Sequence, residues 1–115
     1  GAPMPPNQDE DQEQRDEKSQ QGEFIKRQEL NENELMNLRR FEQKFSKSSE
    51  TMIERLPNGD KVFRTEVQGK VPGSRAVYEK FINSKGQTLK YHKTTYGPDG
   101  SVIHIKDKIN NIQIK

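Results

Sequence analysis

The chain contains no cysteine, so neither disulfide bonds nor a thiolate metal site can support this small fold. No apolar run approaches the roughly 18–20 residues that a membrane-spanning helix needs, and no charged-then-apolar signal peptide opens the chain. Apolar residues are also scarce, at 27% against 33% charged residues. We therefore expect part of the chain to stay disordered, because it cannot bury enough apolar surface to offset the entropy of ordering.

The polar residues are distributed unevenly along the 115-residue chain. Residues 1–22 hold six acidic and two basic residues and no Phe, Leu, Ile or Val, whereas residues 51–115 hold twelve basic and six acidic residues. This pattern predicts a disordered acidic linker over 1–22, opened by a GAPM segment typical of a cloning scar, and one folded domain over 23–115. We expect the whole to be a piece of a longer protein.

A helical pattern begins near Glu23. Asn31 and Glu34 have the spacing of a capping box, which satisfies free backbone N–H groups at the start of a helix. The apolar residues that follow lie three or four apart and so share one helical stripe, and residues 46–49 end the pattern. The stripe consists of Leu35, Leu38, Phe41 and Phe45.

From Thr51 the apolar period changes to two, which is typical of strands. Turn sequences at 57–59, 71–74, 84–86 and 98–100 separate the candidates, and three of them suit three-residue hairpin loops that end in glycine. The predicted fold class is α+β, with an N-terminal amphipathic helix packed on an antiparallel meander of four to five strands. The strand candidates are Thr51–Leu56, Lys61–Val67, Arg75–Asn83, Thr88–Tyr96 and Ser101–Asp107.

The loop at 98–100 predicts a register for the last hairpin in which His104 faces Thr94 and His92 faces Lys106. The loop at 84–86 similarly places Tyr78 opposite His92, Lys80 opposite Lys90 and Phe81 opposite Leu89. Both histidines then share one polar face of the sheet, close enough to act together. The other face collects the residues expected to pack on the helix, Leu89, Tyr91, Ile103 and Ile105.

The residue types on the predicted polar face suit phosphodiester chemistry. Lysine and arginine bind phosphates without sequence preference, and tyrosine stacks on exposed bases. Histidine transfers protons near neutral pH, and a cationic cluster stabilises a five-coordinate phosphorus. The candidate catalytic residues are His104, Thr94, Tyr78 and His92, and the candidate nucleic-acid-binding residues are Arg64, Arg75, Lys80, Lys90, Lys93 and Lys106.

Alternatives from the residues alone remain open. Lysine and threonine are ordinary occupants of a solvent-exposed sheet face, and binding of nucleic acid needs no histidine. Carboxylate pairs of the glycosidase kind, a phosphate-binding glycine loop, a zinc-ligand cluster and a nucleophile elbow are all missing from the sequence. A single metal held by the two histidines with Asp107 or Glu66 is a weaker option, because the register puts Asp107 on the other face.

The segments VPGSRAVYEK and KTTYGPDGSVIHIKDK, preceded by LPNGDKVFRTEVQG, resemble the C-terminal toxin domains of LXG-type polymorphic toxins of Gram-positive bacteria, in particular the YeeF type. The resemblance covers roughly residues 50–108. It implies a nuclease with a fold similar to the small barnase, EndoU and RelE-like toxin nucleases. The residues that match the family pattern are Arg75, Tyr78, Glu79, Lys80, Lys93, Thr94, Thr95, His104, Lys106 and Asp107.

The resemblance also implies a biological setting. The parent toxin would be secreted, would act in the cytoplasm of a competing cell and would be neutralised by a cognate immunity protein, which we expect to be acidic where it covers the basic face. We expect a monomer. The YeeF type implies a DNase without sequence specificity, whereas sister toxins imply an RNase.

The residue chemistry alone favours RNA, which carries its own 2′-hydroxyl nucleophile. DNA hydrolysis usually needs water activated by a divalent metal such as Mg²⁺, although the sequence requires no cofactor. We favour DNA narrowly. The mechanism expected from the sequence has His104 as general acid or base, His92 assisting at most, and the lysines and Arg75 neutralising the phosphodiester.

Overall fold

The computed structural model of the protein describes residues 22–115, which form one α-helix and one antiparallel sheet. The predicted linker lies outside the described residues, except for Gly22. Seven strands follow one another in sheet order β1 to β7 as a meander. Their bounds are β1 Glu23–Phe24, β2 Met52–Arg55, β3 Lys61–Gln68, β4 Arg75–Ile82, β5 Thr88–Tyr96, β6 Val102–Asp107 and β7 Ile112–Gln113; a 3₁₀ turn, η1 Arg27–Glu29, and the helix α2 Glu32–Glu42 lie between β1 and β2.

The α+β class and the five predicted strands are confirmed, with ends that differ by at most two residues. Two details of the prediction are wrong. The helix is not N-terminal, because β1 and η1 occupy the segment from Glu23 where helical periodicity was expected, and the sheet has seven strands rather than four or five. β1 and β7 are two residues long, so they have no period of their own and exist only through pairing with β2 and β6.

The helix begins at the predicted capping box. The Asn31 side chain accepts a hydrogen bond from the Glu34 N–H at 2.8 Å, and the Glu34 carboxylate accepts one from the Asn31 N–H at 2.9 Å. Two of the four free backbone N–H groups at the helix start are thereby satisfied. The predicted stripe faces the sheet: Leu38 and Phe41 are fully buried, and Leu35 and Phe45 pack against them. The rest of the core comes from Ile53, Phe63, Ile82 and Tyr91.

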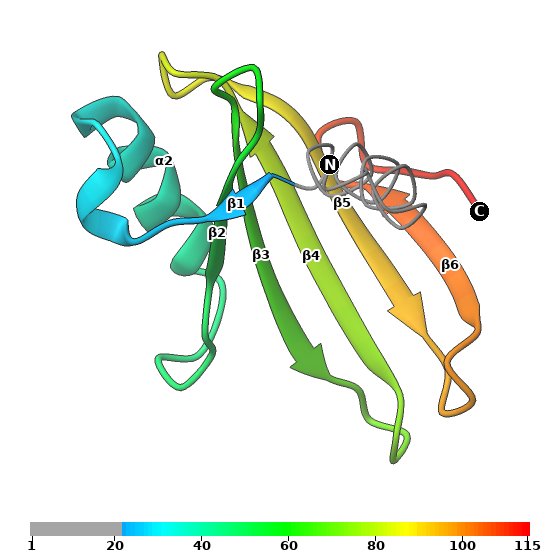
Figure 1. The fold of residues 1–115 in the computed structure, drawn as a ribbon. Helices are drawn as coiled ribbons and strands as arrows, with labels where there is room; N and C mark the ends of the chain where they lie inside the picture. The colour runs from blue at the N-terminus through cyan, green and yellow to red at the C-terminus, as the bar shows by residue number, and fades with distance from the viewer. Residues whose placement is uncertain (1–21) are drawn as a thin grey trace, which may run out of the picture.

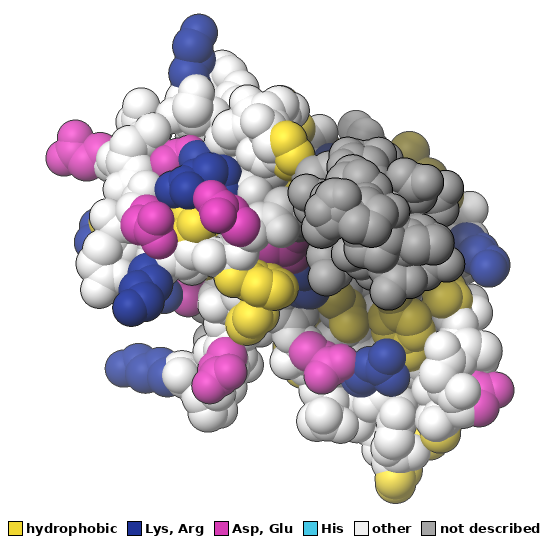
Figure 2. Space-filling model, viewed as in Figure 1, with side chains coloured by type: hydrophobic (Ala, Val, Ile, Leu, Met, Phe, Trp, Pro, Cys, Tyr) yellow, Lys and Arg dark blue, Asp and Glu magenta, His cyan; other side chains and the backbone are white. Residues whose placement is uncertain are grey.

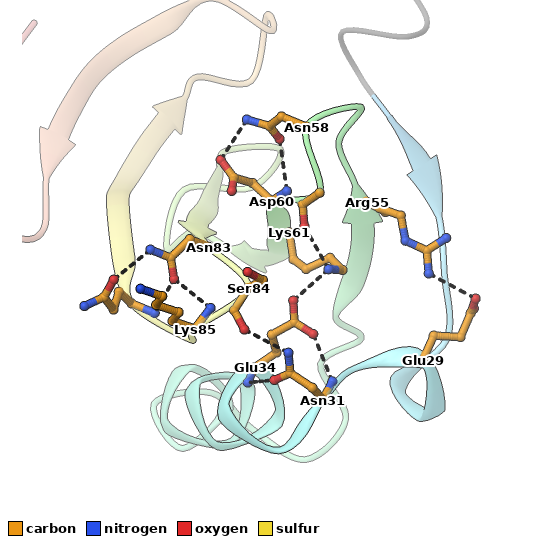
Figure 3. A network of polar contacts seen from close by, with 12 residues as sticks. Glu29, Asn31, Glu34, Arg55, Asn58, Asp60, Lys61, Asn83, Ser84 and Lys85 are labelled. Atoms are coloured by element: carbon orange, nitrogen blue, oxygen red, sulfur yellow. Dashed lines mark hydrogen bonds and ion pairs between the residues drawn. The ribbon is translucent and has the colours of Figure 1, made fainter.

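A buried ion pair joins the helix to the sheet. Lys61 Nζ, at the start of β3, lies 2.6 Å from Glu34 Oε2, and only 9% and 2% of the two side chains are exposed. Asn31 Nδ2 also donates to the Ser84 carbonyl in the β4–β5 loop, and Asn37 Nδ2 donates to the Gly86 carbonyl. Figure 3 shows the carboxylate of Glu34 between Asn31 and the ammonium of Lys61. One carboxylate thus caps the helix and fixes it to the sheet.

Glycine at position 86 lets the helix approach the loop. A Cβ built there would lie 2.5 Å from the Asn33 carbonyl oxygen, and the residue has a φ of 78°. Both features require glycine. The helix therefore sits over one end of the sheet, and Figure 1 shows that β5 and β6 extend beyond it without a helical cover. We call the side of the sheet that packs on α2 the helix face and the opposite side the far face.

The predicted hairpin loops are confirmed, but the registers that follow them are wrong by one residue. Gly97 N–H donates to the Ser101 carbonyl as expected, and Tyr96 pairs with Val102. A β-bulge then leaves Ile103 without a partner, so that His104 pairs with Thr95 rather than Thr94. Because side chains alternate between faces, one inserted residue moves every later side chain to the other face.

The β4–β5 hairpin contains the same irregularity. Ile82 pairs with Thr88 beyond the loop, Leu89 is left unpaired, and Phe81 then pairs with Lys90. Leu89 and Ile103, both expected to pack under the helix, are about half exposed at 50% and 51%. Tyr78 accordingly lies opposite Lys93, Lys80 opposite Tyr91, and His92 between Glu79 and Asp107.

The Glu34–Lys61 pair predicts a large loss of stability when one partner is removed. Glu34→Gln retains an oxygen that can accept from Asn31 but leaves the Lys61 charge buried without its partner, which should cost about 3 kcal/mol in the free energy of unfolding. Urea denaturation followed by circular dichroism measures the loss. The matched control is Glu32→Gln, an exposed acid of the same helical turn, which should lose less than about 1 kcal/mol. Adding Lys61→Met to Glu34→Gln should recover most of the stability, and equal losses in the Glu34 and Glu32 variants would contradict the assignment.

Candidate functional site: a lysine cluster on the helix face

The two faces of the sheet carry different charges. All carboxylates within strands β2 to β6 lie on the far face by strand register, namely Glu54, Glu66, Glu79 and Asp107. The arginines there are neutralised: Arg64 bridges Glu54 and Glu79, and Arg75 lies 2.7 Å from Glu66. In the view of Figure 2, several basic side chains lie directly beside acidic ones.

The helix face of β4 to β6 instead gathers five lysines, which we call the lysine cluster: Lys44, Lys80, Lys93, Lys106 and Lys108. Three of them come from neighbouring strands, since Lys93 pairs with Lys106 across β5 and β6 and Lys80 lies on β4. Lys44 follows the end of α2, and Lys108 follows β6. Burial and the charges of Lys106, Lys44 and Lys93 lower the pKa of Lys108, which shows that the four ammonium groups are close.

Aromatic rings form the floor of the cluster. Lys80 Nζ and Lys44 Nζ lie 5.4 and 5.6 Å from the centre of the Tyr91 ring, and Lys93 Nζ lies 5.6 Å from the centre of the Tyr78 ring. The face of an aromatic ring attracts a cation, so the rings hold the ammonium groups together without neutralising their charge. The cluster therefore presents its positive charge to a ligand.

Lys80 is the most unusual member. The residue is only 8% exposed, and within residues 22–115 no ion pair includes it. Burial, with the charges of Arg40 and Lys44, lowers its pKa to about 8. A buried lysine without a carboxylate partner is costly to the fold, and such groups concentrate at binding and catalytic sites.

The Tyr91 hydroxyl beside it is also unsatisfied. It is buried and has no hydrogen-bond partner among the described residues. Burial and the neighbouring Tyr78 raise the pKa of Tyr91 to about 12, so the hydroxyl keeps its proton at neutral pH. An anionic ligand bound here would accept a hydrogen bond from the Tyr91 hydroxyl and pair with the ammonium group of Lys80.

The structure divides the predicted site residues between the two faces. Tyr78, Lys80, Lys93, His104 and Lys106 lie on the helix face, whereas Arg64, Arg75, Lys90, His92 and Thr94 lie on the far face. The expected placement of both histidines on one face is therefore wrong, because the bulge at Ile103 reverses β6 relative to β5. Thr95 takes the place expected for Thr94 beside His104, which is exposed at the edge of the lysine cluster.

Sequence reasoning missed Lys44, Lys108 and the role of Tyr91. Lys44 carried a usable signal, since it stands three residues after Phe41 and so lies at the border of the apolar stripe. Lys108 lies just beyond the last strand predicted from the sequence, which ends at Asp107, and no local pattern indicates which way its side chain points. Tyr91 was assigned to the core, where it does lie.

Neither a metal-ligand cluster nor a membrane-spanning helix occurs in the described residues. Residues 22–115 contain no group of three or more His, Cys, Asp or Glu side chains placed to hold a metal ion, so a Mg²⁺ requirement stays a prediction. In the same part of the chain, no helix is long and apolar enough to cross a membrane.

Comparisons with protein-family models, curated proteins and solved structures find no match to this chain. The resemblance to LXG-type toxins, and to the barnase, EndoU and RelE-like folds, therefore stays a prediction.

The unpaired Lys80 predicts how stability depends on pH. Its pKa is lowered from 10.5 to about 8, so between pH 8 and 10.5 the unfolded chain binds a proton that the folded chain has released, and stability should rise over that window. Lys80→Met removes this contribution to the pH dependence of stability. Melting temperatures should show the variant more stable than the wild type at pH 7, with the difference shrinking as the pH approaches 10.5. Lys90→Met, an exposed lysine of the far face, serves as control; a wild-type to Lys80→Met difference that is constant with pH would contradict the assignment.

Proposed function

We propose that this domain is a nuclease of the polymorphic-toxin kind, which binds the phosphodiester backbone on the lysine cluster. The observation that supports this most directly is the separation of charge: five lysines converge on the helix face, where strands β2 to β6 carry no carboxylate, and no ion pair within residues 22–115 includes the buried Lys80. A phosphate group would supply the missing negative charge. The arginines of the far face are already bound to carboxylates, so they are less able than the lysine cluster to bind a phosphate.

The cluster suits the chemistry of phosphodiester cleavage. Several ammonium groups around one phosphate stabilise the added negative charge of a five-coordinate transition state. His104 is the exposed titratable group beside the cluster, and in this proposal it accepts a proton from the attacking oxygen or donates one to the leaving oxygen. Lys80 and Lys93 hold the phosphate. His92 takes no part, because it lies on the opposite face between Glu79 and Asp107.

The preferred substrate in this proposal is DNA without sequence specificity, with RNA as the alternative within the same fold. Lysine contacts read charge and not sequence. The resemblance to the YeeF type supports DNA, whereas a site of lysine, histidine and tyrosine side chains also suits RNA, which supplies its own nucleophile. The proposed partner is an acidic immunity protein that covers the lysine cluster, and the proposed setting is a larger secreted toxin, acting as a monomer in the target-cell cytoplasm.

The two histidines make a matched pair for testing catalysis. His104→Ala should lower the rate of phosphodiester cleavage by about 10²-fold or more, because it removes the proton-transfer group of the helix face. His92→Ala should keep the wild-type rate. Supercoiled plasmid and total RNA, each with Mg²⁺ and with EDTA, identify the substrate and the metal requirement in one experiment. Loss of activity in His92→Ala with full activity in His104→Ala would overturn the assignment of the site to the helix face.

A non-catalytic nucleic-acid-binding module is the competing function, and it predicts binding without loss of substrate. In either case binding should be salt-dependent through the helix face. Lys93→Met should reduce the slope of log Kobs against log salt concentration by about 0.9 for duplex DNA, the value for one lost phosphate contact. Lys90→Met, a lysine of the far face on the same strand, should leave the slope unchanged. Fluorescence anisotropy at several salt concentrations gives both slopes. The same change in slope for both variants would show that the two faces bind nucleic acid alike.

A further inference from the structure

A pocket of about 260 Å³ opens beside the lysine cluster. One wall comes from the segment after α2, with Phe45, Ser46 and Ser49, and the other from the sheet, with Val67 of β3 and Tyr78 of β4. Lys44 and Lys108, two members of the lysine cluster, also line it. Local sequence patterns do not reveal this pocket, because its two walls are far apart along the chain.

The walls of the pocket are held in place. The Phe45 and Tyr78 rings meet edge to face with centres 4.8 Å apart, and Tyr78 is further supported by the Tyr91 ring at 6.5 Å. Two hydrogen bonds fix the segment after α2 in place. The Thr65 hydroxyl of β3 donates to the Glu50 carbonyl at 2.7 Å, and the Thr51 hydroxyl donates to the Glu42 carboxylate of α2. A pocket whose aromatic walls are preorganised loses little entropy when a flat ring enters it.

We infer that this pocket receives one unpaired nucleobase, so that the domain acts on single-stranded nucleic acid in preference to a duplex. This inference rests on the proposed function, because it uses the same lysine cluster for the phosphates. Aromatic side chains beside a positively charged surface are the combination that binds single strands, in which base faces are free to stack. In a duplex the base faces are covered by their neighbours, and a base reaches such a pocket only after unstacking.

The chemistry of the lining supports a base over another flat ligand. Val67, Phe45 and Tyr78 supply apolar surface for the faces of a ring, and the hydroxyls of Ser46 and Ser49 can donate to or accept from its polar edge. Lys44 and Lys108 stand where the phosphates on either side of the base would lie. Serine hydroxyls are both donors and acceptors, so the pocket should accept all four bases with little preference.

The test compares a fluorescently labelled single-stranded oligonucleotide with a fully paired hairpin of the same base composition whose loop is a non-nucleotide linker, by anisotropy at one salt concentration with EDTA present. A gel afterwards checks that both oligonucleotides are intact. Wild-type protein should bind the single strand about 10-fold more tightly than the hairpin, the contribution of one stacked base. Val67→Phe fills the pocket from the sheet side and Ser49→Phe fills it from the loop side. Each should abolish the advantage of the single strand while leaving hairpin binding unchanged.

The matched control is Val77→Phe, the same substitution on the far face of β4, which should change neither affinity. Circular dichroism checks that the variants fold. Because Val67→Phe and Ser49→Phe fill the pocket from different walls, the test still works if one of the two variants does not fold. Equal affinity of wild type for the two oligonucleotides, or equal weakening of both by the fillers, would overturn the inference. Failure of the proposed function looks different: both oligonucleotides would be bound with the expected preference while plasmid and RNA stay intact.

Discussion

The position of the helix depends on one buried carboxylate. Glu34 closes the capping box at the helix start and neutralises Lys61 at the start of β3, so the same group fixes where α2 begins and where it meets the sheet. An ion pair buried this deeply tolerates little displacement, because separating the two charges leaves each buried with neither its partner nor water to solvate it. The helix therefore covers one end of the meander as far as Tyr91, and the helix face of β6 and of the rest of β5 has no helical cover.

Two inserted residues determine which side chains lie on each face of the part of the sheet that α2 does not cover. Leu89 and Ile103 each follow a hairpin loop, and each reverses the alternation of the strand beyond it. Only β5 therefore changes face: Lys93 joins Lys80, His104 and Lys106 on the side of α2, whereas Lys90 and His92 face the other side. The carboxylates of β2, β3 and β4 face the other side and neutralise its arginines. Without the bulges Lys90 and His92 would face α2 in place of Lys93.

Lys80 links this arrangement to function. Its ammonium group lies 5.4 Å from the centre of the Tyr91 ring, and burial with the charges of Arg40 and Lys44 depresses its pKa. No ion pair within residues 22–115 compensates this charge. The fold accepts an interaction that destabilises the unliganded protein, which is expected where the same group stabilises a bound anion. In the function that we propose, the neighbouring aromatic pocket adds a place for a base beside the place for a phosphate, and its lining residues come from two segments far apart in the sequence.

Local physics let the sequence determine much of the fold. The capping box at Asn31 and Glu34, the stripe from Leu35 to Phe45 and the glycine-ended loops each depend on residues within one turn or one hairpin. The tertiary structure alone decided the faces, because a bulge adds one residue with no distinctive local sequence and its stability comes from packing. For the same reason the burial of Lys80, the placement of Lys44 and Lys108, and the edge strands β1 and β7 became visible only once the sheet was assembled.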